Sequence, residues 1–168
     1  MKTMLDEHRL GNILGLALPV GAIAELGVRD GGTVAAMRMR WPERRVLAFD
    51  TFNGLPETEG SLECGTYASE PGTRLLLRHL GVEVYAGVFP ATATGTGFAL
   101  VHLDADLYSS TRAGLDYFLP RTRGYIVLDD FARAETPGVA RALAEVVPDW
   151  AAHIWQWQGW LNQIILRV

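Results

Sequence analysis

The sequence has few of the residues that build disulfide or zinc scaffolds. Its 168 residues include a single cysteine, Cys64, and only four histidines. One cysteine cannot form an internal disulfide, so the fold needs no oxidising compartment. No cysteine or histidine pairs stand at the spacing of a structural zinc site. Disulfide-stapled and zinc-stapled scaffolds are therefore excluded.

Positive charge and long apolar segments are also scarce. The chain has 15 Lys and Arg against 19 Asp and Glu, a net charge of −4, which disfavours non-specific binding to nucleic acid or anionic membrane. The apolar stretch 11–24 is interrupted by Gly and Pro19 and is too short to span a bilayer. Asp6 and Glu7 precede it, unlike the positive region of a secretory signal. We therefore expect a cytoplasmic protein that acts on a small molecule.

Short apolar runs alternate with helical patterns along the chain. Hydrophobic residues make up 49% of a length suited to one domain, 1–168. Strands are predicted at 20–27, 45–50, 82–86, 98–106 and 124–130, and helices at about 3–18, 32–40, 71–80, 109–119 and 137–147. Such alternation is typical of an α/β fold with a Rossmann-like, doubly wound, mostly parallel sheet. Its ligand is expected beyond the carboxyl ends of the central strands.

The last sixteen residues, 153–168, predict an antiparallel hairpin that turns near Gly159 and Trp160. Trp155 and Trp157 alternate along its first strand, which is typical of packing groups. A stacking platform for a base or sugar is the alternative interpretation.

A glycine turn follows the first predicted strand. Glu25, Gly27 and Gly31 form E-x-G-x-x-x-G, and the dinucleotide pattern G-x-G-x-x-G is absent. This arrangement favours a ligand without phosphates and with a cationic amino-acid end, for which Glu25 is the partner. Asp50 ends the second strand, where a carboxylate can accept from both ribose hydroxyls. Together these signals indicate a nucleoside-type cofactor, although each alone is also common as plain architecture.

Four aspartates follow two further strands. Asp104 and Asp106 end one run, and Asp129 and Asp130 end the next. If the two strands are neighbours, their carboxylates crowd together and favour a hard divalent cation such as Mg²⁺. Helix capping by Asp106 is the simpler alternative, but it does not account for the other three. His102, two residues before Asp104, is interpreted as a buried core histidine.

Three ordered motifs carry a family resemblance. The segments FDTFNGLPE, HLDADLYSST and YIVLDDF, with AELGVRDGG ahead of them and GVFPAT between, resemble the macrocin O-methyltransferase family of S-adenosylmethionine-dependent sugar methyltransferases. The resemblance covers roughly residues 24–147. It implies the class I methyltransferase fold and transfer of a methyl group to a hydroxyl of a sugar or polyhydroxylated natural product.

The resemblance also implies roles for individual residues. The implied cofactor contacts are Glu25, Gly27, Gly31, Asp50, Thr51, Phe52, Gly87 and Asp104. The implied Mg²⁺ ligands are Asp104, Asp129 and Asp130. The implied catalytic residues are Asp106 and Asp104, and Tyr108 is implied to lie near the acceptor. A cation chelating two sugar hydroxyls would lower the pKa of one, and Asp106 would accept its proton.

One departure and two alternatives stay open. Family members usually carry a longer N-terminal lid, whereas about twenty residues precede the first strand here, so we expect no extended lid and either a large acceptor or closure by a neighbouring subunit in a homo-oligomer. Asp104 and Asp106 also form the D-x-D of metal-dependent glycosyltransferases, a reading that leaves Glu25 and the Asp129–Asp130 pair unused. A non-catalytic cofactor-binding module is the third hypothesis.

Overall fold

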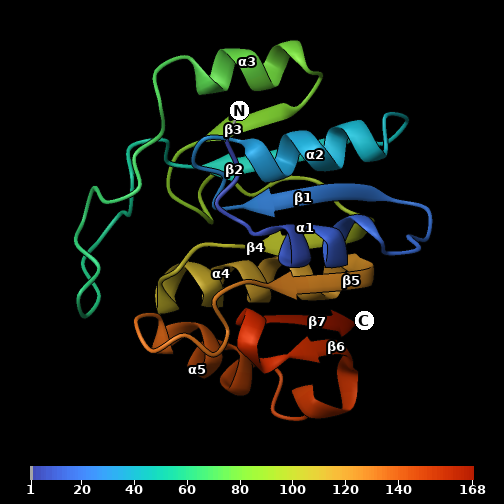
Figure 1. The fold of residues 1–168 in the computed structure, drawn as a ribbon, viewed down its shortest axis with the longest axis vertical. Helices are drawn as coiled ribbons and strands as arrows, with labels where there is room; N and C mark the ends of the chain where they lie inside the picture. Colours follow the sequence, from blue (N-terminus) through green and yellow to red (C-terminus); the bar gives the residue numbers. More distant parts are fainter. Residues whose placement is uncertain (1) are drawn as a thin grey trace.

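A seven-stranded sheet forms the centre of the molecule. The structure is a computed structural model that describes residues 2–168. The strand order is β3-β2-β1-β4-β5-β7-β6 (Figure 1). The strands are β1 Ala22–Leu26, β2 Val46–Asp50, β3 Glu83–Ala86, β4 Phe98–Leu103, β5 Thr122–Leu128, β6 Ile154–Gln158 and β7 Gln163–Arg167. The helices are α1 Glu7–Leu14, α2 Gly32–Arg40, α3 Thr73–His79, α4 Tyr108–Phe118 and α5 Pro137–Val146, with 3₁₀ turns η1 Leu119–Arg121, η2 Trp150–His153 and η3 Gly159–Leu161.

The sheet confirms the predicted α/β class and the C-terminal hairpin. Strands β1 to β5 are parallel, and the strand order reverses between β1 and β4. Strand β7 runs antiparallel to both β5 and β6. The reversal point of a doubly wound sheet is where ligands bind, because the connections leave a crevice there.

The N-terminal helix is shorter than the predicted 3–18. Asp6 caps its start, since the Asp6 side chain accepts from the backbone N–H groups of His8 and Arg9. Gly15 follows its last residue and Pro19 lies four residues further on. Glycine favours helix ends and proline cannot continue a helix, so α1 is limited to two turns.

Two apolar layers cover the sheet. Along β1, Ala24 and Leu26 pack with α4 and α5 on one face, whereas Ile23 packs with α1, α2 and α3 on the other. This alternation follows the two-residue period of a strand. Glu25 shares its face with Ile23 and is nevertheless almost completely buried. A buried carboxylate in a central strand requires a polar partner nearby.

The tryptophans of the hairpin pack against neighbouring rings but stay partly exposed. Trp155 lies edge-on to Tyr125 and Trp157 edge-on to Phe131, with ring centroids 5.6 and 6.0 Å apart. Trp160 contacts His8 in the same way. These contacts support the packing interpretation. None of the helices between residues 2 and 168 has the length and apolar character needed to cross a membrane.

Candidate functional site

A cavity of about 240 Å³ lies at the carboxyl ends of the central strands. It brings together most of the residues that the sequence singled out, which are Glu25, Gly27, Asp50, Thr51, Gly87, Asp104, Asp106, Asp129 and Asp130. These residues come from five separate segments of the chain. The connection between β2 and α3, residues 51–72, projects from the same edge of the sheet (Figure 1).

Gly27 allows β1 and β4 to approach at the floor of the cavity. Its φ is +86°, and a Cβ at this position would lie 1.9 Å from the carbonyl oxygen of Asp104. The backbone N–H of Asp104 donates to the carbonyl of Leu26 at 2.8 Å. The glycine was expected to admit a ligand, and the structure shows that it also admits the neighbouring backbone.

Asp50 organises the turn after β1. Its Oδ2 accepts from the backbone N–H groups of Val28 and Arg29 at 2.6 and 2.8 Å, and its Oδ1 accepts from Phe52 at 2.6 Å. A carboxylate offers about four lone-pair positions, so three backbone donors leave little unused capacity. Asp50 lines the cavity as expected, and its contact with a ribose stays a prediction.

Glu25 and His102 form a buried pair next to this turn. Nδ1 of His102 lies 2.8 Å from Oε1 of Glu25, and the two side chains are 0% and 2% exposed. Burial raises the pKa of Glu25. Burial opposes a charge on His102, but the hydrogen bond to Glu25 and the negative charges of Glu25 and Asp129 together outweigh burial and raise the pKa of His102. Oε2 of Glu25 has no hydrogen-bond partner among the described residues, so it can accept from a ligand.

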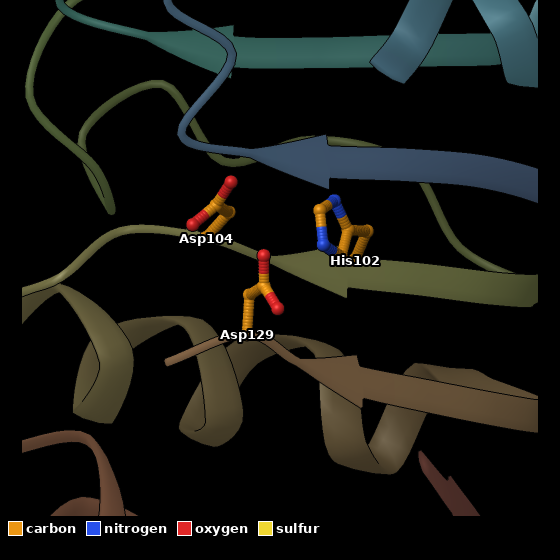
Figure 2. Close-up of side chains that lie close together, drawn as sticks. All are labelled: His102, Asp104 and Asp129. Atoms are coloured by element: carbon orange, nitrogen blue, oxygen red, sulfur yellow. The ribbon is translucent and has the colours of Figure 1, made fainter. Parts of the chain in front are cut away.

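The aspartates meet because β4 and β5 end in register. Leu103 pairs with Leu128, so the next residues, Asp104 and Asp129, stand side by side, and the N–H of Asp129 donates to the carbonyl of Leu103. Single ligand atoms of His102, Asp104 and Asp129 lie within 4.8 Å of one another. Figure 2 shows the Asp129 carboxylate directed toward the other two side chains. A second group with the same spacing joins Asp104, Asp106 and Asp130.

Crowding and burial change the acidity of these carboxyls. Burial, followed by the charge of Asp129, raises the pKa of Asp104 well above its ordinary value. Burial and the charge of Asp130 raise the pKa of Asp106 to about 7. Burial also raises the pKa of Asp129, although His102 and Arg9 oppose this. Such mutual repulsion is what a bound cation would relieve.

Arg9 and Arg133 supply counter-charges that the sequence analysis did not identify. Nη1 of Arg9, on α1, lies 3.1 Å from Oδ2 of Asp129 and 3.7 Å from Oδ1 of Asp130. Nη1 of Arg133 lies 3.3 Å from Oδ1 of Asp130. Arg9 is 120 residues from Asp129 in the chain, and no local pattern links the two. Only the packing of α1 against the sheet brings them together.

The N-terminal segment forms part of the cavity wall. Residues 2–5 line the cavity together with Arg9. The hydroxyls of Thr3 and Thr33 are 2.8 Å apart, and a Cβ on Gly32 would lie 2.2 Å from the backbone nitrogen of Thr3. This segment was expected to leave the pocket without a lid. The structure shows that its first residues nevertheless cover one side, because they pack against the start of α2.

Three residues that the resemblance implied do not line the cavity. Gly31 precedes α2 with φ +79°, and Phe52 packs in the core beneath α2 and α3. The hydroxyl of Tyr108 donates to Glu145 of α5 at 2.6 Å. Their assigned ligand contacts stay predictions. Tyr67 of the projecting connection does line the cavity, and no pattern in the sequence indicated it.

The raised pKa of Asp106 leads us to expect that the protein loses stability as the pH rises. The pKa of Asp106 is about 7 when folded against 3.8 ordinarily, so the folded state binds more protons and stability falls as pH rises from about 4 to 7. Tm is measured by thermal melting of the wild type and of Asp106→Asn in the presence of a chelator. We expect the wild-type Tm minus the variant Tm to fall by at least about 5 °C between pH 5 and pH 8. Mg²⁺ should restore wild-type Tm more at pH 8 than at pH 5. A difference that is constant with pH would contradict the burial of this carboxyl.

Comparison with known proteins places this fold. No family model matches the chain. A relative from Streptomyces olivaceus, 8-demethyl-8-(2,3-dimethoxy-alpha-L-rhamnosyl)-tetracenomycin-C 4'-O-methyltransferase, is 31% identical over 169 aligned positions, covering 77% of this chain and 62% of the relative. The O-methyltransferase NovP superimposes with a TM-score of 0.82 and 24% identity over 98% of this chain and 81% of that one. This chain has the class I methyltransferase fold.

The other comparisons agree with this fold. The calicheamicin methyltransferase CalS11 superimposes with a TM-score of 0.75 and 24% identity, over 97% of this chain and 80% of that one. The predicted resemblance to sugar O-methyltransferases is confirmed by the Streptomyces relative, and the two structures confirm the fold. The chain spans 62% of that relative's length. In this methyltransferase fold, the cavity lies at the switch point between β1 and β4, where the cofactor crevice is expected.

Proposed function

We propose that the protein transfers a methyl group from S-adenosylmethionine to a hydroxyl of a sugar or polyhydroxylated compound. The observation that carries this proposal is the meeting of two chemically different groups in one cavity. Glu25 and Asp50 lie at the ends of β1 and β2, and the aspartates lie at the ends of β4 and β5. The first group suits the amino and ribose ends of the donor, and the second suits a hydroxylated acceptor.

Glu25 suits the ammonium group of the methyl donor because one of its carboxylate oxygens, Oε2, is available to bind it. Its Oε2 is buried and unpartnered among the described residues, and the residue lines the cavity. An ammonium group placed there would satisfy this oxygen with a charge-assisted hydrogen bond. S-adenosylmethionine supplies an electrophilic methyl group on a sulfonium. The protein's contribution is to hold donor and acceptor in line, since positioning supplies much of the rate enhancement of such transfers.

The aspartates fit a divalent cation, which we propose as Mg²⁺ or another hard dication. Four carboxylates line this part of the cavity, and Arg9 and Arg133 pair with only two of them, Asp129 and Asp130. Oδ1 of Asp129 is buried without a partner among residues 2–168. Carboxylate oxygens are the ligands that such ions prefer. We propose Asp104, Asp129 and Asp130 as the ligands. A cation held there would supply Lewis acidity that lowers the pKa of an acceptor hydroxyl.

Asp106 is the proposed general base. It lines the cavity beside Asp130, and its pKa of about 7 suits proton transfer near neutral pH. Its backbone adopts φ +59°, a left-handed conformation that non-glycine residues seldom adopt. Strained conformations of this kind concentrate at functional sites. Asp106 would accept the proton of the acceptor hydroxyl as that oxygen attacks the methyl carbon, while the S–CH₃ bond breaks and S-adenosylhomocysteine leaves.

The proposed acceptor class rests on the relative. The relative's name describes a methyltransferase of a rhamnosyl-bearing compound. We therefore propose a sugar-bearing acceptor of natural-product biosynthesis, used in the cytoplasm. A homo-oligomer in which a neighbouring subunit completes the wall opposite residues 2–5 stays part of this proposal.

Asp129→Ala tests the proposed division of the cavity. We expect it to abolish the stimulation of methyl transfer by Mg²⁺ and most of the activity, because it removes a cation ligand. The affinity for S-adenosylhomocysteine, measured by calorimetry, should change little, because Glu25 and Asp50 are untouched. Transfer is measured with labelled S-adenosylmethionine and a panel of glycosides.

Asp116→Ala is the matched control, because Asp116 is an exposed aspartate of α4 that pairs with Arg112. It should leave both measurements unchanged. Unaltered turnover of Asp129→Ala would refute the role given to Asp129. Metal-dependent UDP binding without S-adenosylhomocysteine binding would favour a glycosyltransferase. Cofactor binding by the wild type with no transfer to any glycoside would favour a non-catalytic module.

A further inference from the structure

His102 has a buried nitrogen that the fold does not use. Its side chain is fully buried, and Nδ1 is engaged by Glu25 at 2.8 Å. Nε2 has no hydrogen-bond partner in the part of the chain that the structure describes. Leaving a buried polar atom unpaired costs about 1–3 kcal/mol. His102 does not itself line the cavity, but Glu25, Asp104 and Asp129 do, so its unpaired imidazole nitrogen calls for a ligand shared with these neighbours.

A buried oxygen of the neighbouring residue Asp129 is unpaired as well. Oδ1 of Asp129 has no partner among residues 2–168, whereas Oδ2 of Asp129 is bonded to Arg9. One nitrogen of His102 and one oxygen each from Asp104 and Asp129 lie within 4.8 Å of one another (Figure 2). Because Nδ1 is already bonded to Glu25, Nε2 is the nitrogen available to this group. Arg9 does not compete for the free oxygen.

We propose that His102 is a ligand of the divalent cation through Nε2, together with Asp104 and Asp129. This inference rests on the cation of the proposed function and changes its coordination from oxygen-only to mixed nitrogen and oxygen. His102 lies near the end of β4, and Asp104 directly follows the last residue of this strand, Leu103, so both residues lie close to its carboxyl end. Asp129 reaches them from β5, the adjacent strand.

Glu25 then acts as the partner that prepares His102 for this role. Coordination at Nε2 requires the ring proton to be on Nδ1, where Oε1 of Glu25 accepts it. Carboxylates placed behind metal-bound histidines commonly fix the tautomer and raise the basicity of the ligating nitrogen. The buried charge of Glu25 would also be balanced by the cation on the other side of the ring.

A nitrogen ligand changes which cations the site prefers. Mg²⁺ is bound mainly by oxygen ligands, whereas imidazole suits first-row transition metals and stabilises them in the order Mn²⁺ < Fe²⁺ < Co²⁺. We therefore expect the site to bind Mn²⁺ and Co²⁺ more tightly than Mg²⁺. An oxygen-only site formed by Asp104, Asp129 and Asp130 would also bind Mn²⁺ more tightly than Mg²⁺, so the inference is separated from it by a direct nitrogen signal and by the part of this preference that depends on His102.

Pulsed electron paramagnetic resonance of the Mn²⁺-loaded wild type tests the coordination directly. We expect the electron spin echo of Mn²⁺ to be modulated by a directly bound ¹⁴N nucleus. When the protein is prepared with ¹⁵N-histidine, this modulation should be replaced by the pattern of ¹⁵N. His102→Gln should lose this modulation and weaken Mn²⁺ binding by at least about tenfold, while Mg²⁺ binding changes much less. His79→Gln is the matched control, because His79 lies on the exposed end of α3, and it should behave as wild type.

The labelled wild type decides the question even if His102→Gln does not fold. Bound Mn²⁺ without nitrogen coupling, or the absence of Mn²⁺ binding, would overturn the inference. Methyl transfer is assayed on the same preparation to separate the two proposals. Nitrogen coupling without transfer to any acceptor would count against the proposed function and leave His102 as a ligand. Metal-stimulated transfer without nitrogen coupling would support the proposed function and show that His102 is not a ligand.

Discussion

Replacing Asp106 by asparagine is expected to slow methyl transfer by about 10²- to 10⁴-fold, the contribution typical of a general base. The amide has nearly the same shape but cannot accept the proton of the acceptor hydroxyl. Asparagine also tolerates the left-handed conformation that Asp106 adopts, so the fold should be preserved. The measurement is kcat with saturating donor and cation, together with the Kd for S-adenosylhomocysteine, which should not change.

The pH profile of the wild type belongs to the same prediction. Because the pKa of Asp106 is about 7, the basic form predominates only above that pH, and kcat/KM should rise through neutrality. Cation binding lowers this pKa, so higher Mg²⁺ should move the rise to lower pH. Asp116→Asn, an exposed control on α4, should keep the wild-type profile. An Asp106→Asn enzyme with the wild-type rate would remove Asp106 from the chemistry.

Gly27→Ala is expected to destabilise the protein by about 3 kcal/mol or more, from backbone strain and a steric clash together. The residue has φ +86°, and its new Cβ would overlap the carbonyl oxygen of Asp104. Relief of this overlap requires β1 and β4 to separate at the floor of the cavity. Since domains are stable by only about 5–15 kcal/mol, the change should lower Tm strongly, and donor binding should weaken in the fraction that stays folded.

Gly72→Ala separates the two causes of this effect. Gly72 has φ +89°, almost the same conformation, but a Cβ there would meet nothing within 4 Å. It should therefore show the backbone strain alone, about 1–2 kcal/mol. Urea unfolding of both variants gives the two free energies. Equal losses would show that Gly27 is needed only for its conformation and not for the approach of the two strands.

The sequence was most informative where one physical rule governs a whole element. The helix predicted at 32–40 matches α2, and the helices predicted at 109–119 and 137–147 differ from α4 and α5 by one residue at their ends. Buried parallel strands read as continuous apolar runs because both faces are covered. The prediction at 98–106 ran past the end of β4 at Leu103, since the acids that follow leave the extended conformation, as the φ of +59° at Asp106 shows.

Polar partners were harder to predict because they depend on distant segments. The local environment of His102 is an apolar strand, so the sequence indicated a satisfied core histidine, but within residues 2–168 only one of its nitrogens has a hydrogen-bond partner. Arg9 contacts Asp129 across 120 residues. Tyr108 has a motif position near the acid cluster, yet its side chain turns to Glu145 on α5. In each case the neighbour is supplied by packing between elements.

The order of strands, helices and motif residues was determined by the sequence alone, because hydrophobic periodicity and turn residues act over a few positions. It also determined that acids follow two strands, as Asp104 and Asp129 do. Only the tertiary structure decided that these strands are adjacent and in register, that Arg9 and His102 join the acids, and which buried atoms stay unpaired. The physical reason is that charge, burial and hydrogen bonding at a site are properties of side chains brought together in space.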